Sequence, residues 1–147
     1  DVLHRDIKPQ NVILRDGRWD QPVLVDFGLA KRPFDRGLTD PQMLIGTPGY
    51  MAPEVIRGTP LDHRSDLFSA GLVARFALTG LEVFPELAGL KLLQAIASRP
   101  VPLPRCVTPG TRELLRRLLV VEPTRRTPSA QALLAELDAM QPTTHCA

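Results

Sequence analysis

Three side chains near the start of the chain, Asp6, Lys8 and Asn11, have the types and spacing to act on one phosphate group. They precede the apolar run 12–14, so we expect a loop that leads into a strand. Phosphoryl transfer needs a carboxylate to orient and deprotonate the attacking hydroxyl, a cation beside the phosphoryl group, and an oxygen ligand for magnesium. The three residues supply one of each. Taken alone, an Asp or Asn in a loop is more often a turn former or cap.

A second carboxylate, Asp26, follows fifteen residues after Asn11, in the sequence Asp-Phe-Gly. Between them the apolar runs 12–14 and 22–25 flank the Asp-Gly pair at 16–17, a strong hairpin signal. A hairpin would carry Asn11 at one end and Asp26 at the other. The two oxygen ligands would then face the same metal ion.

The remaining elements that the sequence predicts are a long loop and a set of helices. Residues 32–60 are rich in Gly, Pro, Thr and Asp without a clear period, which is typical of a loop. After them, apolar residues recur at helical spacing, and the first of these helices is hydrophobic enough to be buried and central. The expected helices are residues 63–78, closed by Gly80, and residues 86–98, 111–121 and 129–140.

Composition limits the class of protein. The 147 residues fit one domain, and 44% apolar and 23% charged residues are ordinary for a soluble globular protein. A net charge of +2 gives no nucleic-acid footprint, so we expect no nucleic-acid partner. Cys106 and Cys146 do not make a disulfide framework, and no stretch approaches the roughly 18 apolar residues of a membrane span. We therefore expect a cytoplasmic protein without a membrane segment.

Three motifs occur in order: His-Arg-Asp-x-Lys-Pro-x-Asn at 4–11, Asp-Phe-Gly at 26–28 and Ala-Pro-Glu at 52–54. In this series they make the chain resemble the large, C-terminal lobe of a eukaryotic-type serine/threonine protein kinase. The resemblance implies an α+β, mainly α, kinase-like fold in which a small β-hairpin carries the catalytic loop and the Asp-Phe-Gly motif. It covers residues 1–140, and residues 141–147 look like a flexible tail.

Further residues refine the resemblance. Lys8 and the segment 46–54 are typical of serine/threonine rather than tyrosine kinases. The Pro-Gln-Asn ending at 9–11 and the arginine-rich composition resemble bacterial members. The chain begins within a motif, with Asp1 rather than Met and with an apparent strand at 2–3, so we expect a fragment of a longer kinase.

The resemblance implies a role for each chemical residue. Asp6 would be the catalytic base and Lys8 the contact to the γ-phosphate of ATP. Asn11 and Asp26 would hold Mg²⁺, and Ile13 would form the floor under the adenine. The implied cofactors are ATP and Mg²⁺, and the implied partners are protein substrates.

Other matches are structural. His4 and Phe27 resemble the lower members of the hydrophobic spine of an active kinase. Asp66 resembles the acid at a helix start that holds the backbone of the catalytic loop. Glu54 and Arg126 match a buried ion pair that ties the Ala-Pro-Glu motif to the late helices.

Two threonines and one arginine suggest substrate contact and regulation. Thr47 matches the threonine that hydrogen-bonds the catalytic Asp and Lys, although a loop threonine is often only a local hydrogen-bonder. Arg5 precedes the catalytic Asp, and Thr39 is the only hydroxyl side chain between Asp26 and Gly46. We expect phosphorylated Thr39 to pair with Arg5; alternatively, Thr39 is simply a turn residue.

The sequence contains no Gly-x-Gly-x-x-Gly, and neither Lys31 nor Lys91 is placed to hold the α- and β-phosphates. We therefore expect the 147-residue polypeptide alone to bind ATP poorly and to be inactive. The alternative function is a non-catalytic, kinase-like binding or scaffold module. A small-molecule phosphotransferase is disfavoured by the segment 47–54, which shapes a protein-substrate groove in the family.

Overall fold

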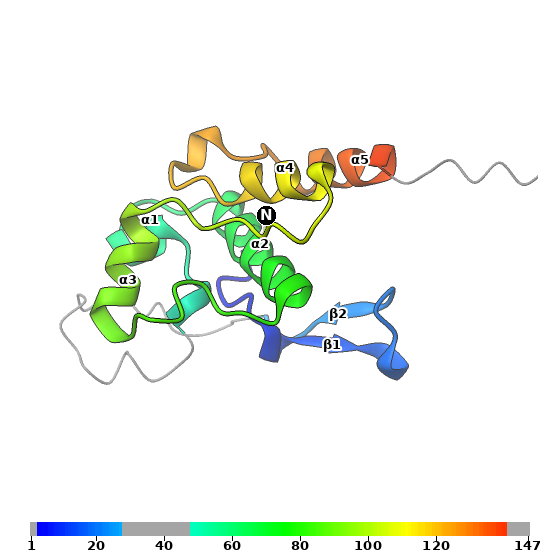
Figure 1. Ribbon diagram of the computed structural model, residues 1–147, viewed down its shortest axis with the longest axis horizontal. Helices are drawn as coiled ribbons and strands as arrows, with labels where there is room; N and C mark the ends of the chain where they lie inside the picture. Colours follow the sequence, from blue (N-terminus) through cyan, green and yellow to red (C-terminus); the bar gives the residue numbers. More distant parts are fainter. Residues whose placement is uncertain (1–2, 28–47, 141–147) are drawn as a thin grey trace, which may run out of the picture.

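The computed structural model describes residues 3–27 and 48–140 (Figure 1). The first part forms a two-stranded antiparallel sheet from β1 (Val12–Leu14) and β2 (Pro22–Leu24), with Val12 opposite Leu24. The predicted Asp-Gly turn lies inside the longer connection between the strands. Asp16 and Gly17 both have positive φ angles, of 53° and 71°, and the N–H of Arg18 donates to the carbonyl of Arg15 at 2.9 Å.

The second part is helical. Its α-helices are α1 (Pro53–Arg57), α2 (His63–Thr79), α3 (Gly89–Ser98), α4 (Pro109–Leu118) and α5 (Ala130–Met140). Single 3₁₀ turns occupy Pro9–Asn11, Arg15–Gly17, Pro48–Tyr50 and Pro123–Arg125. The expectation of a mainly helical α+β fold with one small sheet is confirmed.

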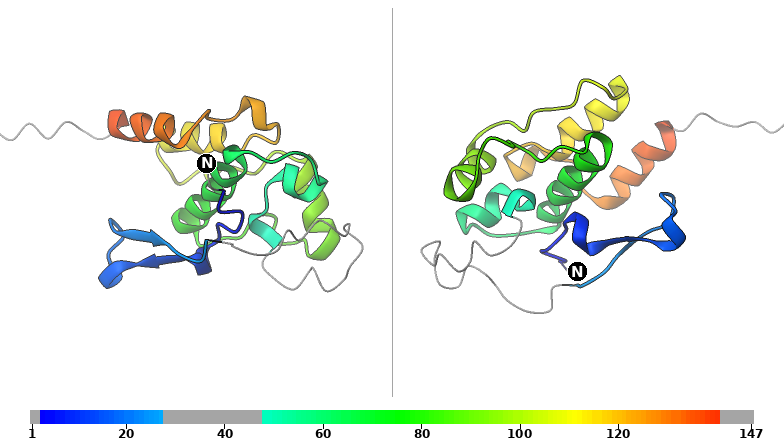
Figure 2. Two further views of the ribbon diagram at one scale, coloured as in Figure 1. Left: turned by 180° about the vertical axis from the view of Figure 1, so that it is seen from behind. Right: turned by 60° about the horizontal axis from the view of Figure 1, so that its bottom comes forward.

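Helix α2 is the central element, and α4 packs across it (Figures 1 and 2). The carboxylate of Asp62 caps its first turn by accepting from the N–H of Arg64 at 2.8 Å. Gly80 ends it in the left-handed conformation, at φ 67°. The predicted helix at 63–78 and its closing glycine are thus confirmed.

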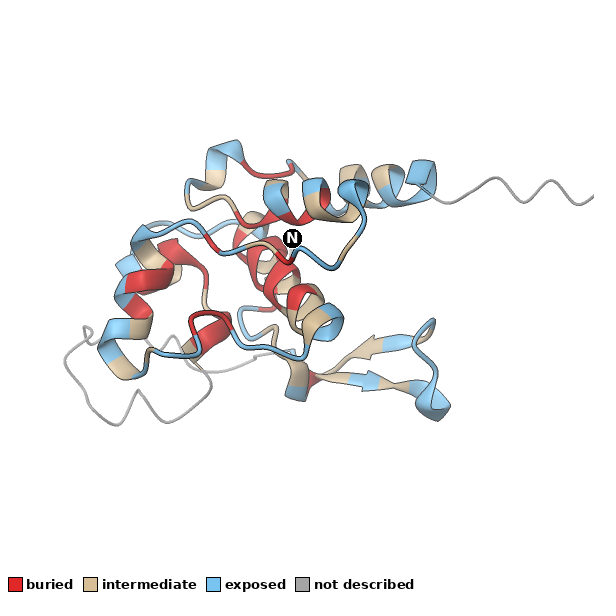
Figure 3. Cartoon of the chain, viewed as in Figure 1, coloured by how far each residue is buried: buried red, intermediate tan, exposed pale blue. Residues whose placement is uncertain are grey.

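The core surrounds α2, where the buried positions gather (Figure 3). Phe68 of α2, Ile96 of α3 and Leu115 of α4 are almost completely buried. Gly71 lets α2 and α4 approach closely, because a Cβ at this position would lie 3.0 Å from side-chain atoms of Leu118 and Leu119. A larger residue there would force the two helices apart.

The structure corrects several expected boundaries. The prediction of a loop throughout 32–60 is wrong in its described part, because Pro48–Tyr50 is a 3₁₀ turn and α1 is a helix. Proline at the first helical position and left-handed Gly58 at the end account for α1. Within residues 3–27 and 48–140 there are therefore five α-helices rather than four. The strand expected at 2–3 is absent at Leu3, which is irregular.

Two later helices begin elsewhere than predicted. Helix α3 starts at Gly89 instead of 86, because the positive φ of Gly89, 55°, interrupts a helix that would begin at 86. Helix α4 starts at Pro109 instead of 111, because the hydroxyl of Thr108 caps it and proline fits the first turn. It ends at Leu118 rather than 121. Across residues 3–27 and 48–140, none of the helices has the length and apolar character to cross a membrane.

Candidate active site

The loop 4–11 brings the three side chains of the predicted chemistry together. The ammonium of Lys8 lies 2.8 Å from Oδ2 of Asp6. The amide Nδ2 of Asn11 donates to the same oxygen at 3.0 Å and to the backbone carbonyl of Asp6 at 2.8 Å. Asn11 is buried, whereas the side chain of Asp6 remains 48% exposed. The carboxylate is therefore held at one oxygen while its surface stays open to a reactant.

Asp66, in the first turn of α2, anchors the backbone of this loop. Its two carboxylate oxygens accept from the N–H groups of His4 and Arg5, at 2.8 and 2.9 Å. Arg5 has a positive φ of 66°, a conformation that costs most residues about 1–2 kcal/mol. The two charge-assisted hydrogen bonds hold the loop in that bend, so α2 sets the position of the residues that follow.

The imidazole of His4 links the loop to the hairpin. The N–H of Asp6 donates to Nδ1 of His4 at 3.4 Å, which requires this nitrogen to be unprotonated. Nε2 then carries the proton and donates to the carbonyl of Val25 at 3.1 Å. The ring also lies 4.9 Å from the ring of Phe27, centroid to centroid. The loop and the end of β2 are thus fixed to each other through one buried side chain.

The hairpin places Asn11 and Asp26 at neighbouring positions. The N–H of Val25 donates to the carbonyl of Asn11 at 2.9 Å, and Asp26 comes directly after Val25. Both hydrogen bonds from Asn11 to Asp6 are made by its Nδ2. Among the described residues, no hydrogen bond reaches its Oδ1. An amide oxygen and a carboxylate are the hard donors that Mg²⁺ takes from protein, with phosphate oxygens completing its shell. The two side chains present therefore fit this metal.

The other sequence-predicted residues divide into three groups. Ile13 is 53% exposed on β1 and Phe27 is 56% exposed. Arg5 is exposed on the loop next to Asp6. Thr39 and Thr47 lie outside the described residues, so the structure does not place them beside Arg5 or Asp6.

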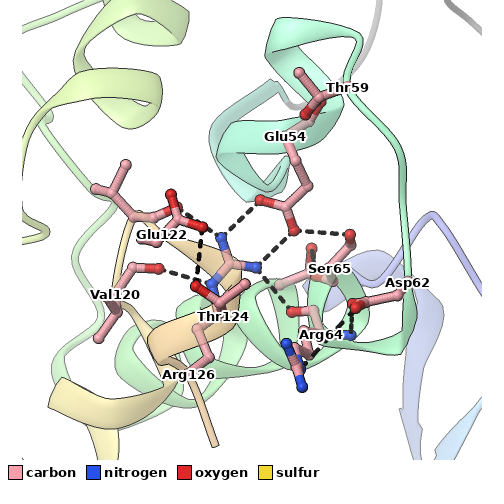
Figure 4. A network of polar contacts seen from close by, with 11 residues as sticks. Glu54, Thr59, Asp62, Arg64, Ser65, Val120, Glu122, Thr124 and Arg126 are labelled. Atoms are coloured by element: carbon pink, nitrogen blue, oxygen red, sulfur yellow. Dashed lines mark hydrogen bonds and ion pairs between the residues drawn. The ribbon is translucent and has the colours of Figure 1, made fainter. Parts of the chain in front are cut away.

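Glu54 of α1 and Arg126, which follows the 3₁₀ turn Pro123–Arg125, form a bidentate ion pair (Figure 4). Their two oxygen–nitrogen distances are both 2.6 Å, and the side chains are only 3% and 0% exposed. The remaining N–H groups of the guanidinium donate to the carbonyls of Arg64, Val120 and Val121 at 2.7–3.0 Å. All five donors of Arg126 are therefore satisfied, and the pair joins α1 to the start of α2 and to the end of α4.

The charge on Glu54 is stabilised by these contacts. Burial by itself raises the pKa of this carboxyl. Hydrogen bonds from Arg126 and from Ser65, whose hydroxyl lies 2.7 Å away, lower the pKa, and together the lowering effects outweigh that of burial. The net pKa lies below the ordinary value of 4.5. Glu54 is therefore ionised at neutral pH and paired with a full positive charge.

Sequence reasoning missed three polar residues on α2 and on the turn before α1. The hydroxyl of Ser65 supports Glu54, and the phenol of Tyr50 donates to Glu82 at 3.0 Å. Burial is the largest cause that raises the pKa of Tyr50, and the hydrogen bond to Glu82 is the next. Arg75 is buried in α2 and donates to the carbonyls of Leu81 and Pro102. The sequence signal for this role of Arg75 was an arginine within the mostly apolar stretch 67–78 of α2.

The chain matches the family described as "Protein kinase domain" over residues 1–137. It is 38% identical to "Serine/threonine-protein kinase pkn3" of Myxococcus xanthus, over 95% of this chain and 28% of that protein. It is 36% identical to "DNA damage-responsive serine/threonine-protein kinase RqkA" of Deinococcus radiodurans, over 95% of this chain and 21% of that protein. With "Serine/threonine-protein kinase PkaA" of Streptomyces coelicolor the identity is 35%, over 90% of this chain and 24% of that protein.

The chain thus spans about a quarter of the length of these curated relatives, two of which match over nearly all of it. The motifs that match are carried by a mainly helical fold with one small sheet. The family match includes the loop 4–11, Asp26 and the Glu54–Arg126 pair. This chain belongs to the protein kinase domain family, and the proteins to which it is similar include bacterial serine/threonine kinases.

Proposed function

We propose that this chain supplies the large lobe of a protein serine/threonine kinase, which transfers the γ-phosphate of ATP to Ser or Thr hydroxyls of protein substrates. The observation that carries the proposal is the geometry of Asp6. One oxygen of its carboxylate accepts from Lys8 and Asn11, at 2.8 and 3.0 Å, and the side chain stays half exposed. A carboxylate held in this way is oriented for a hydroxyl that approaches its other oxygen.

In this proposal each residue of the loop has one task. Asp6 orients the substrate hydroxyl and accepts its proton at Oδ1, because Oδ2 is already engaged by its neighbours. Lys8, within 2.8 Å of Asp6, neutralises negative charge on the transferred phosphoryl group. Asn11 fixes the carboxylate through Nδ2. Thr47 would add a hydrogen bond to Asp6 and Lys8.

Nucleotide and metal would be held at the end of the hairpin. Mg²⁺, when bound, supplies positive charge to the phosphates of ATP. Oδ1 of Asn11 and the carboxylate of Asp26 would hold it, and exposed Ile13 would lie under the adenine. The Asp-Phe-Gly hairpin and the loop 4–11 would together form the nucleotide side of this lobe.

We assign residues 1–140 to the kinase domain and residues 141–147 to a flexible tail. Phosphorylation of Thr39 would switch the enzyme on by pairing with Arg5, through charge-assisted hydrogen bonds. Phosphosite mapping of the active enzyme tests this assignment: an unmodified Thr39, together with a fully active Thr39→Ala variant, would contradict it.

The 147 residues lack the glycine-rich loop and strand lysine that enclose ATP in kinases. We therefore expect the polypeptide alone to be inactive, and isothermal titration that gave micromolar Mg-ATP affinity for it would refute this.

Sequencing the DNA upstream of Asp1 separates the kinase from a non-catalytic scaffold. An open reading frame with Gly-x-Gly-x-x-Gly and a strand lysine supports the enzyme.

The protein from that reading frame gives the direct test. Incubated with radiolabelled ATP, Mg²⁺ and casein, it should label serine and threonine, and Asp6→Asn should slow the labelling at least about a hundredfold. Labelling at an undiminished rate in Asp6→Asn, or labelling confined to tyrosine, would overturn the proposal.

A further inference from the structure

A groove of about 540 Å³ lies between α1 and α3, apart from the candidate active site. The two helices lie side by side in Figure 1 and in both views of Figure 2. This volume is within the roughly 300–1,000 Å³ that ligand sites in proteins occupy. Half-buried Leu87 and Ala97 and buried Ala95 supply an apolar part of its lining.

Three cations converge on this groove. Arg57 comes from the end of α1, Lys91 from the first turn of α3, and Arg99 directly follows α3. Within residues 3–27 and 48–140, no carboxylate lies within ion-pair distance of any of them. Other arginines of the described part, such as Arg18 and Arg116, do have a carboxylate partner. The groove is therefore a local concentration of positive charge on a protein whose net charge is only +2.

Arg57 is held at the groove by a hydrogen bond to α3. One of its terminal nitrogens donates to the carbonyl of Ala97 near the end of α3. This bond uses one of the five N–H donors of the guanidinium and restrains its position. A restrained, planar guanidinium matches a carboxylate or phosphate and loses little further conformational entropy on binding.

We propose that this groove binds an acidic segment of a partner protein. The three cations select an anionic ligand, and the apolar part of the lining suits a segment that also carries an aliphatic side chain. The described lining residues include no aromatic ring on which a nucleic-acid base could stack, so a peptide fits better than a single-stranded oligonucleotide. The surface acts independently of phosphoryl transfer, and its role does not require the chain to be active.

Fluorescence anisotropy tests the proposal with the full chain and a fluorescein-labelled Glu-Glu-Leu-Glu-Glu-Leu peptide. Binding should weaken as salt screens the charges. It should be lost when Gln replaces every Glu. The double variant Lys91→Glu/Arg99→Glu should weaken binding about tenfold, because two attractions become repulsions.

The matched control is Arg105→Glu/Arg125→Glu, which changes the net charge equally at exposed positions outside the groove. It should change the affinity less than about twofold. Equal weakening by both double variants, no binding of the Glu peptide, or tighter binding of a labelled oligonucleotide of the same charge would overturn the proposal.

A second measurement needs no variant and so holds even if the charge reversal unfolds the chain. The chain has only three lysines, Lys8, Lys31 and Lys91, so amine acetylation can be followed at each by mass spectrometry. The Glu peptide should protect Lys91 from acetylation, the Gln peptide should not, and labelling of Lys8 should be unchanged. Equal protection of Lys8 and Lys91, or none at Lys91, would contradict binding in the groove.

Discussion

Two carboxylate–cation pairs in this protein have similar geometry and opposite surroundings. Glu54 and Arg126 meet at 2.6 Å with side chains that are 3% and 0% exposed. Asp6 and Lys8 meet at 2.8 Å with side chains that are 48% and 26% exposed. In the buried pair every N–H of the guanidinium is used, whereas the exposed pair leaves one carboxylate oxygen open among the described residues. The first pair therefore fixes the fold, and the second is available for chemistry.

The largest effect is expected at the buried pair. Arg126→Met should lower the free energy of unfolding by about 3–5 kcal/mol, because it leaves the Glu54 carboxylate buried without its partner. Urea denaturation of the full chain measures the loss. Arg125→Met is the matched control, since Arg125 is the exposed neighbour and should change stability by no more than about 0.5 kcal/mol. Similar losses in both variants would show that burial of the pair is not the cause.

The exposed pair should behave in the opposite way. In an active protein that contains this chain, Asp6→Asn should lower kcat by about 10²–10⁴-fold, because the amide cannot accept the proton. The unfolding free energy should stay within about 0.5 kcal/mol of the wild type, since exposed pairs contribute little.

Asp20→Asn serves as the control for this prediction. Asp20 forms another exposed ion pair, 2.7 Å from Arg18 in the hairpin connection. Phosphate transfer should be unchanged in this variant. A comparable loss of kcat at Asp6 and Asp20 would mean that the effect reflects the hairpin and not the reacting group.

Asp66 connects the two regions, and its replacement should have an intermediate effect on stability. Asp66→Asn leaves a single acceptor for the N–H groups of His4 and Arg5, so we expect a loss of about 1–3 kcal/mol. Hydrogen exchange at those two amides should accelerate in parallel. Asp138→Asn, at an exposed position of α5, should change neither quantity. Unchanged exchange at both amides in Asp66→Asn would contradict the anchoring role.

The smallest effect is expected from pH. The pKa of Glu54 in the folded protein is depressed below 4.5, so its ionisation contributes stability that is present above that pH. This contribution is lost as the pH falls through the lower folded-state pKa. The difference in urea midpoint between the wild type and Glu54→Gln should therefore be constant from neutral pH to about 5 and shrink below it. A difference that persists unchanged at pH 3 would contradict a depressed pKa.

Much of the candidate site could be predicted because its residues lie in short motifs. The loop 4–11 and Asp26 are local signals, and Gly80 marked the end of α2 correctly. Helix α1 was missed because Gly, Pro and Thr dominate its flanks, although Pro53 and Gly58 are start and stop signals in their own right.

Contacts between distant residues were predicted only where the family resemblance supplied them. The pairing of Glu54 with Arg126 joins positions 72 residues apart, and no periodicity in the sequence indicates it. The hydrogen bonds from Ser65 to Glu54 and from Tyr50 to Glu82 had no such precedent and appeared only with the fold. The groove between α1 and α3 is of the same kind, because packing of the two helices brings its cations together.

The positive φ of Arg5 has a consequence for how this protein could evolve. Glycine adopts that conformation without the steric penalty that arginine carries, so Arg5→Gly relieves the bend without disturbing Asp66. Glycine also raises the conformational entropy of the unfolded chain, so the net change in unfolding free energy is the difference between the two effects. Under the proposed pairing of Arg5 with phosphorylated Thr39, a lineage that took this substitution would lose that pairing, whatever it gained in thermal stability.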